Sequence, residues 1–208
     1  MTARVICISR AMLTNADVIA QGVAEGLGYR IVDEEIVARA AQRRNLSPAE
    51  VANAERRKSL LASLVEEIGD SSTDVIKFIT NPKEAGAHDD VRHLIRDAIM
   101  ETADEGNVVI VAHAASYALA RRPDVLRVLI TGSEFGRANK WLPKSGGKSP
   151  REAQEIIRES DAARANYLKR FYDVKNESPQ DYDITVSIDS LSEPGATQLI
   201  LAAAKAIQ

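Results

Sequence analysis

The chain has 208 residues, a formal net charge of -3 and 4% aromatic residues. This length suits one domain with its own core, and the acidic balance argues against general binding to nucleic acid or an anionic membrane. The one cysteine, Cys7, excludes an internal disulfide. We find no secretion signal and no apolar run near the roughly 20 residues of a membrane span. We therefore expect a cytoplasmic protein.

The N-terminal residues predict a strand, a turn and a helix in that order. Residues 4–9 are mostly apolar, residues 10–16 form the turn, and the helix over 17–27 stops at Gly28. This is the order in which phosphate-binding loops are built, but the glycines that should line the turn are absent. The order of strand, turn and helix points to phosphoryl transfer, whereas the residues of the turn do not.

Four further short apolar runs, each flanked by helical stretches, predict strands. Continuous rather than alternating apolar character is typical of parallel strands that are covered on both faces. We therefore predict the α/β class, with a five-stranded parallel sheet flanked by helices. The four runs span residues 29–32, 108–111, 125–130 and 184–188.

The helical stretches between the strands differ greatly in length. Residues 34–105 form a long, mostly helical insertion, in which Ser47, Pro48 and Glu50 mark one capped helix start. A second helix is expected over about 89–104. Towards the C-terminus we expect a loop over 132–147 and helices over 150–172 and 195–207.

Residues 145–149, Ser-Gly-Gly-Lys-Ser, superficially resemble a Walker loop. Such a loop needs a preceding strand and a glycine five residues before the final Gly-Lys pair, where this chain has Leu142. Ser149 and Glu152 instead predict a capping box that begins the long helix. Lys144 and Lys148 can still reach a phosphate as point charges from a lid.

The N-terminal turn resembles the cytidylate kinase-like family, a branch of the P-loop nucleoside monophosphate kinases whose members tend to read I-S-R-E-Y-G-S-G-G-R-E here. Residues 8–10 match directly, and 24–29 and 32–36 continue the match. In this register the family's G-S-G-G-R falls on residues 13–17, which are Leu-Thr-Asn-Ala-Asp. The resemblance therefore implies a degenerate Walker A loop.

These replacements act against nucleotide binding in the standard mode. Glycines adopt positive φ and approach phosphate oxygens closely, whereas Leu13 adds a bulky side chain at the same place. Asp17 interacts favourably with the helix dipole, by on the order of 1 kcal/mol, but it repels a triphosphate. The alternative interpretation is an ordinary capped turn with no ligand.

The second half of the chain resembles the same family. Residues 108–115 are similar to its V-I-V-G-R-G-A, with Ala112 and His113 in place of a Gly-Arg pair whose arginine is expected to reach the acceptor phosphate. His113 either holds a phosphate or fills a polar niche at a strand end. Residues 121–128 and 179–192 also match the family pattern.

Arg158, Asp161 and Arg164 are spaced to share one face of the long predicted helix. Cytidylate kinases carry an Asp and an Arg at this spacing to bind a pyrimidine monophosphate. The resemblance therefore implies that Asp161 accepts from the base while the arginines clamp phosphate. The alternative is an ordinary intrahelical ion pair.

The resemblance implies a three-layer P-loop kinase fold in one domain. Its core comprises residues 1–33, 106–133 and 173–208, its acceptor-binding insertion 34–105 and its lid region 134–172. The implied reaction is phosphoryl transfer from ATP with Mg²⁺ to CMP or a similar small acceptor, weakened or altered by the degenerate loop. The alternative is a catalytically silent nucleotide-binding or regulatory module.

The expected partner is a small-molecule nucleotide, and we expect no nucleic-acid or membrane partner. Whether the chain forms a homo-oligomer is left open by the sequence. No His or Cys spacing predicts a protein-built metal centre. The candidate catalytic residues are Arg10, Arg158 and Arg164; the candidate phosphate-binding residues are Ser9, Arg10, Thr14 (also for Mg²⁺), Asn15, Lys144 and Lys148; the candidate acceptor-binding residues are Asp33, His113, Asp161 and Arg164.

Overall fold

The computed structural model describes residues 2–33, 96–111, 115–120, 122–144 and 149–207, with the backbone alone at residues 144, 167, 170 and 171. It contains one five-stranded sheet in the order β2-β3-β1-β4-β5, and every neighbouring pair is parallel. This confirms the predicted α/β class and all five predicted strands. The strands are β1 (Val5–Arg10), β2 (Arg30–Val32), β3 (Val108–Val111), β4 (Val125–Thr131) and β5 (Ile184–Ser187).

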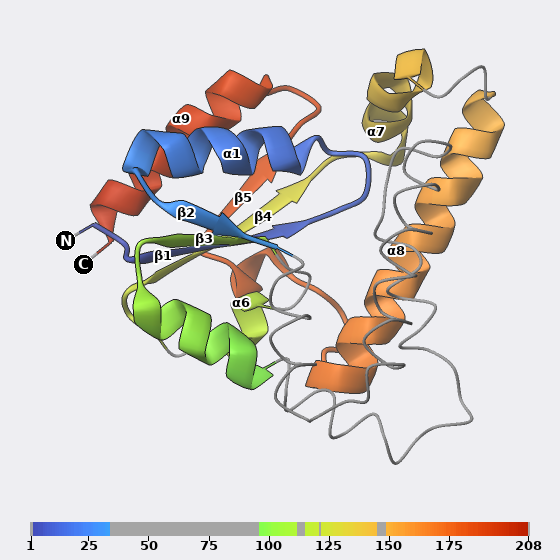
Figure 1. The fold of residues 1–208 in the computed structure, drawn as a ribbon. Coiled ribbons are helices and arrows are strands. Elements are labelled where there is room, and N and C mark those ends of the chain that lie inside the picture. The colour runs from blue at the N-terminus through green and yellow to red at the C-terminus, as the bar shows by residue number, and fades with distance from the viewer. Residues whose placement is uncertain (1, 34–95, 112–114, 121, 145–148, 208) are drawn as a thin grey trace, which may run out of the picture.

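Helices cover both faces of the sheet and so form three layers (Figure 1). Helices α1 (Ala16–Leu27) and α9 (Glu193–Ala206) pack together on one face, while α6 (Ala115–Ala118) and a helical segment over residues 96–105 lie on the other. Among the described residues, no helix is long and apolar enough to span a bilayer.

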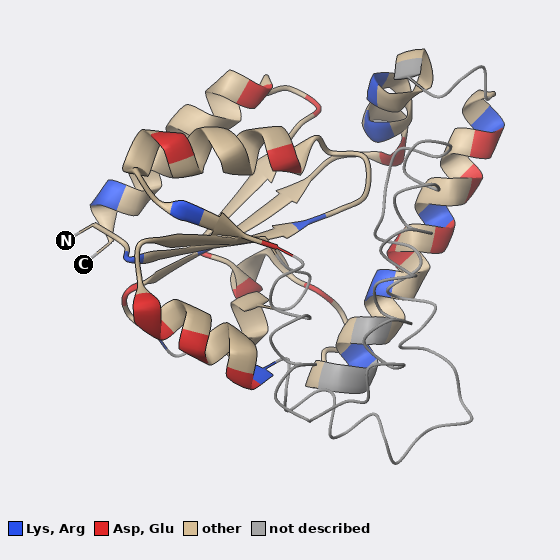
Figure 2. Ribbon diagram, viewed as in Figure 1, with Lys and Arg blue, Asp and Glu red and all other residues tan. Residues whose placement is uncertain are grey.

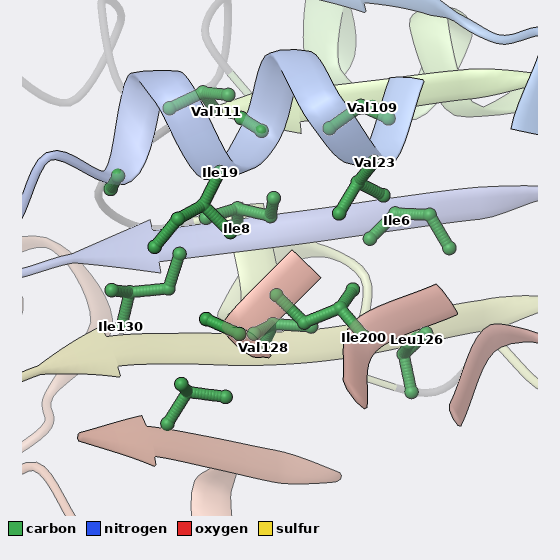
Figure 3. Close-up of a cluster of buried hydrophobic side chains, with 14 of the residues drawn as sticks. Ile6, Ile8, Ile19, Val23, Val109, Val111, Leu126, Val128, Ile130 and Ile200 are labelled. Carbon is green, nitrogen blue, oxygen red and sulfur yellow. The ribbon is translucent and has the colours of Figure 1, made fainter. Parts of the chain in front are cut away.

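The sheet core follows from the alternation of side chains along β1. Ile6 and Ile8 join the cluster under α1 and α9 (Figure 3), whereas Val5 and Cys7 join the cluster on the opposite face. All four side chains are fully buried. This is why continuous apolar runs mark strands that are covered on both faces.

Two further helices, α7 (Glu134–Trp141) and α8 (Pro150–Tyr172), lie beyond the carboxyl ends of the strands (Figure 1). The predicted α8 bounds are confirmed, and Ser149 and Glu152 form the predicted capping box. The loop predicted over 132–147 is wrong over most of its described part. Ser133 caps α7 by accepting from the Gly136 N–H, and a 3₁₀ turn over Leu142–Lys144 follows.

Most of the predicted insertion falls outside the described residues, including the capped start at Ser47. Its described C-terminal part, residues 96–105, is helical as predicted. The helix is followed by Gly106 and Asn107, both with positive φ, which turn the chain into β3.

Candidate functional site

The β1–α1 loop, residues 11–15, begins at the carboxyl end of the central strand, the usual place for ligands in open parallel sheets. Leu13 and Asn15 both adopt left-handed backbone conformations, with φ of 62° and 53°. These are two of the positions at which the family pattern has glycine. The loop therefore follows a glycine-like backbone path although it contains no glycine.

Hydrogen bonds hold this loop to the sheet and to α9. The Ala11 N–H donates to Ile130 O at 2.9 Å, and the buried Thr14 hydroxyl donates to Ala11 O at 2.8 Å. Asn15 Nδ2 donates to Glu193 Oε1 at 3.0 Å instead of capping α1 with its side chain. The Asn15 side chain therefore does not cap the first-turn N–H groups of α1. An anion-binding helix N-terminus requires such uncapped N–H groups.

Apolar side chains of the same loop pack against the predicted lid region. Met12 and Leu13 are buried in a cluster with side chains from α7 and α8. We call this cluster the latch and define it by its six buried members: Met12, Leu13, Ala138, Trp141, Ala153 and Ile157.

Arg10 lies at the start of the loop and is mostly buried. It pairs with Asp17 in the first turn of α1, and its Nη2 lies 3.8 Å from Asp33 Oδ2. Two carboxylates therefore offset the charge of a candidate phosphate-binding residue. The structure brings Asp33, predicted to bind the acceptor, to this edge of the loop.

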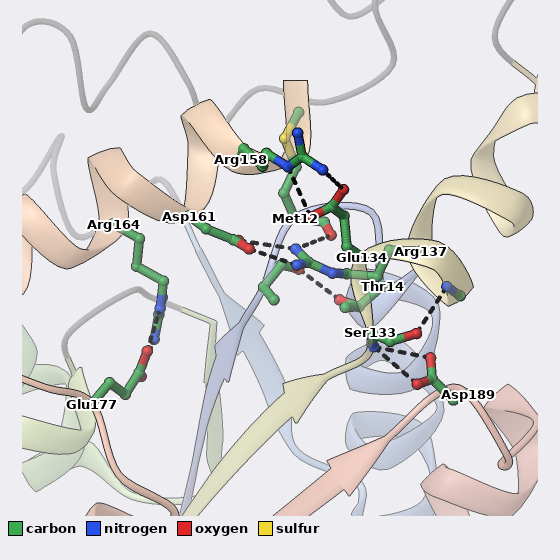
Figure 4. A network of polar contacts seen from close by, with 12 residues as sticks. Met12, Thr14, Ser133, Glu134, Arg137, Arg158, Asp161, Arg164, Glu177 and Asp189 are labelled. Carbon is green, nitrogen blue, oxygen red and sulfur yellow. Dashed lines mark hydrogen bonds and ion pairs between the residues drawn. The ribbon is translucent and has the colours of Figure 1, made fainter. Parts of the chain in front are cut away.

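Arg137 on α7 connects this helix and α8 to the loop and was not among the predicted site residues. Its guanidinium forms a bidentate pair with Asp161, at 2.9 Å to Oδ1 and 2.6 Å to Oδ2 (Figure 4). Its Nη1 also donates to Met12 O at 3.3 Å, and the residue is 4% exposed. A buried arginine needs such partners, but they are distant in sequence, so no local signal indicated them.

Arg164 on α8 is buried and contacts the residue at which the loop begins. Its Nε and Nη2 donate to Glu177 Oε2 and Oε1 at 2.8 and 2.5 Å, and Nη1 donates to Arg10 O at 3.2 Å. Burial lowers the pKa of this guanidinium, but Glu177 outweighs burial and leaves the pKa above its ordinary value. Burial, followed by the charge of Glu177, raises the pKa of neighbouring Tyr182 to about 12.

The three charged residues predicted to share a face of α8 all find partners outside that helix. Arg158 pairs with Glu134 on α7 at 2.8 Å, Asp161 pairs with Arg137, and Arg164 pairs with Glu177 (Figure 4). Acidic and basic residues are interspersed along α8 (Figure 2). These pairs connect α8 to α7 and to the chain before β5. They are therefore not the ordinary intrahelical ion pair that was the alternative interpretation of this face.

The remaining predicted residues divide between buried and undescribed positions. Ser9 is fully buried, and its hydroxyl lies 3.1 Å from the Ser116 hydroxyl. His113, Lys148 and the side chain of Lys144 fall outside the described residues. The structure therefore places Arg10, Thr14, Asn15 and Asp33 at the loop. Asp161 is connected to the loop through Arg137, and Arg164 contacts Arg10 O directly.

Comparisons with known proteins bear on the family and the fold. A family model described as the cytidylate kinase-like family matches residues 5–190. No curated protein matches the chain.

Solved structures provide the second comparison. The chain is similar to an uncharacterized protein from Eubacterium ventriosum, at 16% identity over 98% of this chain and 99% of that chain, with a TM-score of 0.68. A gluconokinase from Sinorhizobium meliloti shares 16% identity over 98% and 92%, with a TM-score of 0.56. A shikimate kinase from Bacteroides thetaiotaomicron shares 15% over 96% and 97%, with a TM-score of 0.51. At these identities the likeness shows the fold alone.

Proposed function

The chain belongs to the cytidylate kinase-like family, and we propose on this basis that it transfers a phosphoryl group from ATP to CMP or a similar small acceptor. The transfer is slow because side chains around the β1–α1 loop compete with the phosphates. Its P-loop kinase fold supports this class of reaction. The reaction needs little covalent chemistry from the protein beyond positioning and charge neutralisation.

The backbone of the β1–α1 loop carries this proposal. Left-handed residues at Leu13 and Asn15 precede a helix of 12 residues whose first turn is not capped by the Asn15 side chain. Successive N–H groups in such turns, together with a helix N-terminus, attract phosphate oxygens. This chain maintains that backbone although leucine is a costly residue for it, by about 1–2 kcal/mol.

The acceptor side of the proposal rests on Asp161 and Arg158. Asp161 is 45% exposed despite its bidentate pair with Arg137, so its carboxylate retains lone pairs for a base amino group. Arg158 is 65% exposed and can exchange Glu134 for an acceptor phosphate. Arg164 is buried against Glu177, so we assign it the positioning of the loop through Arg10 O.

A Mg²⁺ ion would enter this site with the nucleotide. No group of three or more His, Cys, Asp or Glu among the described residues could hold a metal ion. Thr14 donates its hydroxyl proton to Ala11 O, which leaves its oxygen lone pairs for a ligand. When bound, Mg²⁺ neutralises charge on the transferring phosphates.

The ion pairs around the loop favour a second candidate, a catalytically silent nucleotide-binding module. Arg10, Arg137 and Arg158 are each paired with carboxylates, so an incoming phosphate must displace or share those partners. Asp17 adds negative charge at the first turn of α1. Such a module would retain acceptor binding without transfer.

Calorimetric titration with MgATP and separately with CMP, combined with an assay for ADP formation, tests the proposal. We expect both ligands to bind and ADP to form only when CMP is present. Asp161→Asn should weaken CMP binding about tenfold, the loss of one charge-assisted hydrogen bond. Glu159→Gln on the exposed side of α8 is the matched control.

The two candidates give different results in this experiment. Binding of CMP without MgATP binding and without ADP formation would establish the silent module. If neither nucleotide binds, both candidates are wrong.

A further inference from the structure

We propose that the latch holds the lid helices α7 and α8 against the β1–α1 loop when no nucleotide is bound, and that it must open before phosphates reach the loop. The latch thus limits nucleotide affinity from within the chain. The gating part of this proposal rests on the proposed nucleotide binding, whereas the existence of the latch does not.

The latch joins three segments that are far apart in sequence. Met12 and Leu13 come from the loop, Ala138 and Trp141 from α7, and Ile157 with Ala153 from α8. All six side chains are buried, so opening the lid exposes apolar surface to water. The apolar side chains that replace the expected glycine chemistry therefore stabilise contact between loop and lid.

Leu13 is the latch residue with a left-handed backbone. Its φ of 62° lies in the left-handed region, where the Cβ of leucine crowds the following carbonyl oxygen. Such a conformation persists only where the surroundings over-determine it. Here Leu13 packs in one cluster with side chains of α7 and α8, and we infer that this packing maintains its left-handed backbone. Met12, Leu13 and Thr14 are all buried, so the loop is covered.

Polar contacts reinforce the apolar ones on both sides. Arg137 joins Met12 O to Asp161, so one side chain connects the loop to α7 and α8. At the start of α7, the Ser133 N–H donates to Asp189 Oδ2 at 2.9 Å (Figure 4). Near its end, Lys140 Nζ lies 4.0 Å from Glu193 Oε1, the oxygen that also accepts from Asn15.

The latch can open without unfolding the core. Its six members belong to neither of the two clusters that flank the sheet. Local opening of such a separate unit requires less free energy than global unfolding. A nucleotide that binds only the open state then shows an affinity reduced by the fraction of open protein.

Two natural reporters allow these events to be separated. Trp141, the one tryptophan, is buried in the latch, and Cys7, the one cysteine, is buried in the core. Burial raises the pKa of the Cys7 thiol to about 12, which keeps it protonated and unreactive while the core is folded. Latch opening exposes the tryptophan alone, whereas unfolding exposes both.

The test uses Leu13→Asn, since asparagine tolerates the left-handed conformation but removes the apolar contact. We expect the Trp141 emission to move to longer wavelength and acrylamide quenching to increase, with Cys7 still unreactive towards a thiol reagent. Phe135→Ala, an exposed position on α7 outside the latch, is the matched control and should change neither reporter.

A second variant separates gating from a direct effect on the loop. Ile157→Ala loosens the latch from α8 without changing a loop residue. If the latch gates the site, both variants should bind MgATP at least about fivefold more tightly, the lower end of typical coupling between sites. Calorimetric titration of the full chain measures this change.

Four results are decisive. An unchanged Trp141 signal in folded Leu13→Asn protein would overturn the latch, and so would simultaneous exposure of Trp141 and Cys7. Exposure of Trp141 with an unchanged, measurable MgATP affinity would overturn the gating. Exposure of Trp141 with no MgATP binding in any variant would support the latch and instead contradict the proposed function.

Discussion

The sheet core and the latch are both apolar, but they are built in different ways. The core cluster under α1 and α9 unites alternate side chains of four parallel strands with two helices, and their register is set by backbone hydrogen bonds. The latch has no shared backbone ladder and joins a loop to two helices through side chains, with ion pairs around it. Global stability therefore resides in the core, whereas access to the loop depends on the latch.

The largest expected effect comes from a cavity in the core. Ile200 on α9 is fully buried, so Ile200→Ala should lower the free energy of unfolding by about 2–5 kcal/mol. Urea unfolding followed by Cys7 reactivity measures this loss. Leu199→Ala, next to it and 45% exposed, should cost much less. Equal losses at the two positions would mean that α9 does not bury Ile200 in the core while leaving Leu199 exposed.

A smaller loss is expected when the buried arginine on α8 is removed. Arg164→Met leaves Glu177 without its main partner in a mostly buried position, which should cost about 2–3 kcal/mol. Thermal and urea unfolding measure the change.

Arg158→Met is the matched comparison on the same helix. This side chain is exposed, so its pair with Glu134 should contribute little to stability, while its loss weakens CMP binding. A large stability loss for Arg158→Met with unaltered CMP binding would reverse the roles assigned to these two arginines.

The strain in the loop predicts a difference between two substitutions at one position. Leu13→Ala and Leu13→Gly both remove the latch contact, but only glycine relieves the left-handed backbone. After the entropy cost of glycine, Leu13→Gly should be the more stable variant by about 1 kcal/mol. If Leu13→Ala is the more stable of the two, the loop does not hold a positive φ in solution.

The smallest effect concerns the response to acid of Asp124, which lies just before β4. The hydrogen bonds from Arg122 lower the pKa of Asp124 below its ordinary value of 3.8, although burial opposes them. Because the unfolded chain binds this proton first as the pH falls, the stabilisation is present above pH 3.8 and is lost below it.

Asp124→Asn should therefore flatten the loss of stability below that pH. Urea midpoints measured between neutral pH and acid check this, with Asp173→Asn, at the left-handed C-cap of α8, as control. An unchanged acid slope in Asp124→Asn would assign the acid sensitivity to other carboxylates.

Several elements were predictable because their signals are local. The apolar run over residues 108–111 coincides with β3, and the Ser149 capping box marks the start of α8. Helix α7 escaped prediction because Gly136 lies inside it and Pro143 follows closely, so its pattern is weak. Its cap at Ser133 and its contacts with Met12 and Leu13 stabilise it nonetheless.

The candidate site was predictable in part. Arg10, Thr14 and Asn15 lie together because they are neighbours at the carboxyl end of β1, and Asp33, which follows β2, comes within 3.8 Å of Arg10. Arg137 was missed because its partners Asp161 and Met12 O lie 24 and 125 positions away along the chain. No periodicity indicates a pairing of that kind.

The amino-acid pattern was sufficient for the parallel sheet, the long helix and the family, because each of these is written in short stretches of neighbouring residues. The path of the β1–α1 loop was not readable in that way, since leucine gives no local reason to expect a glycine-like backbone at residue 13, although Asn15 tolerates one. That path depends on contacts with α7, α8 and α9, which exist only once distant segments have packed together.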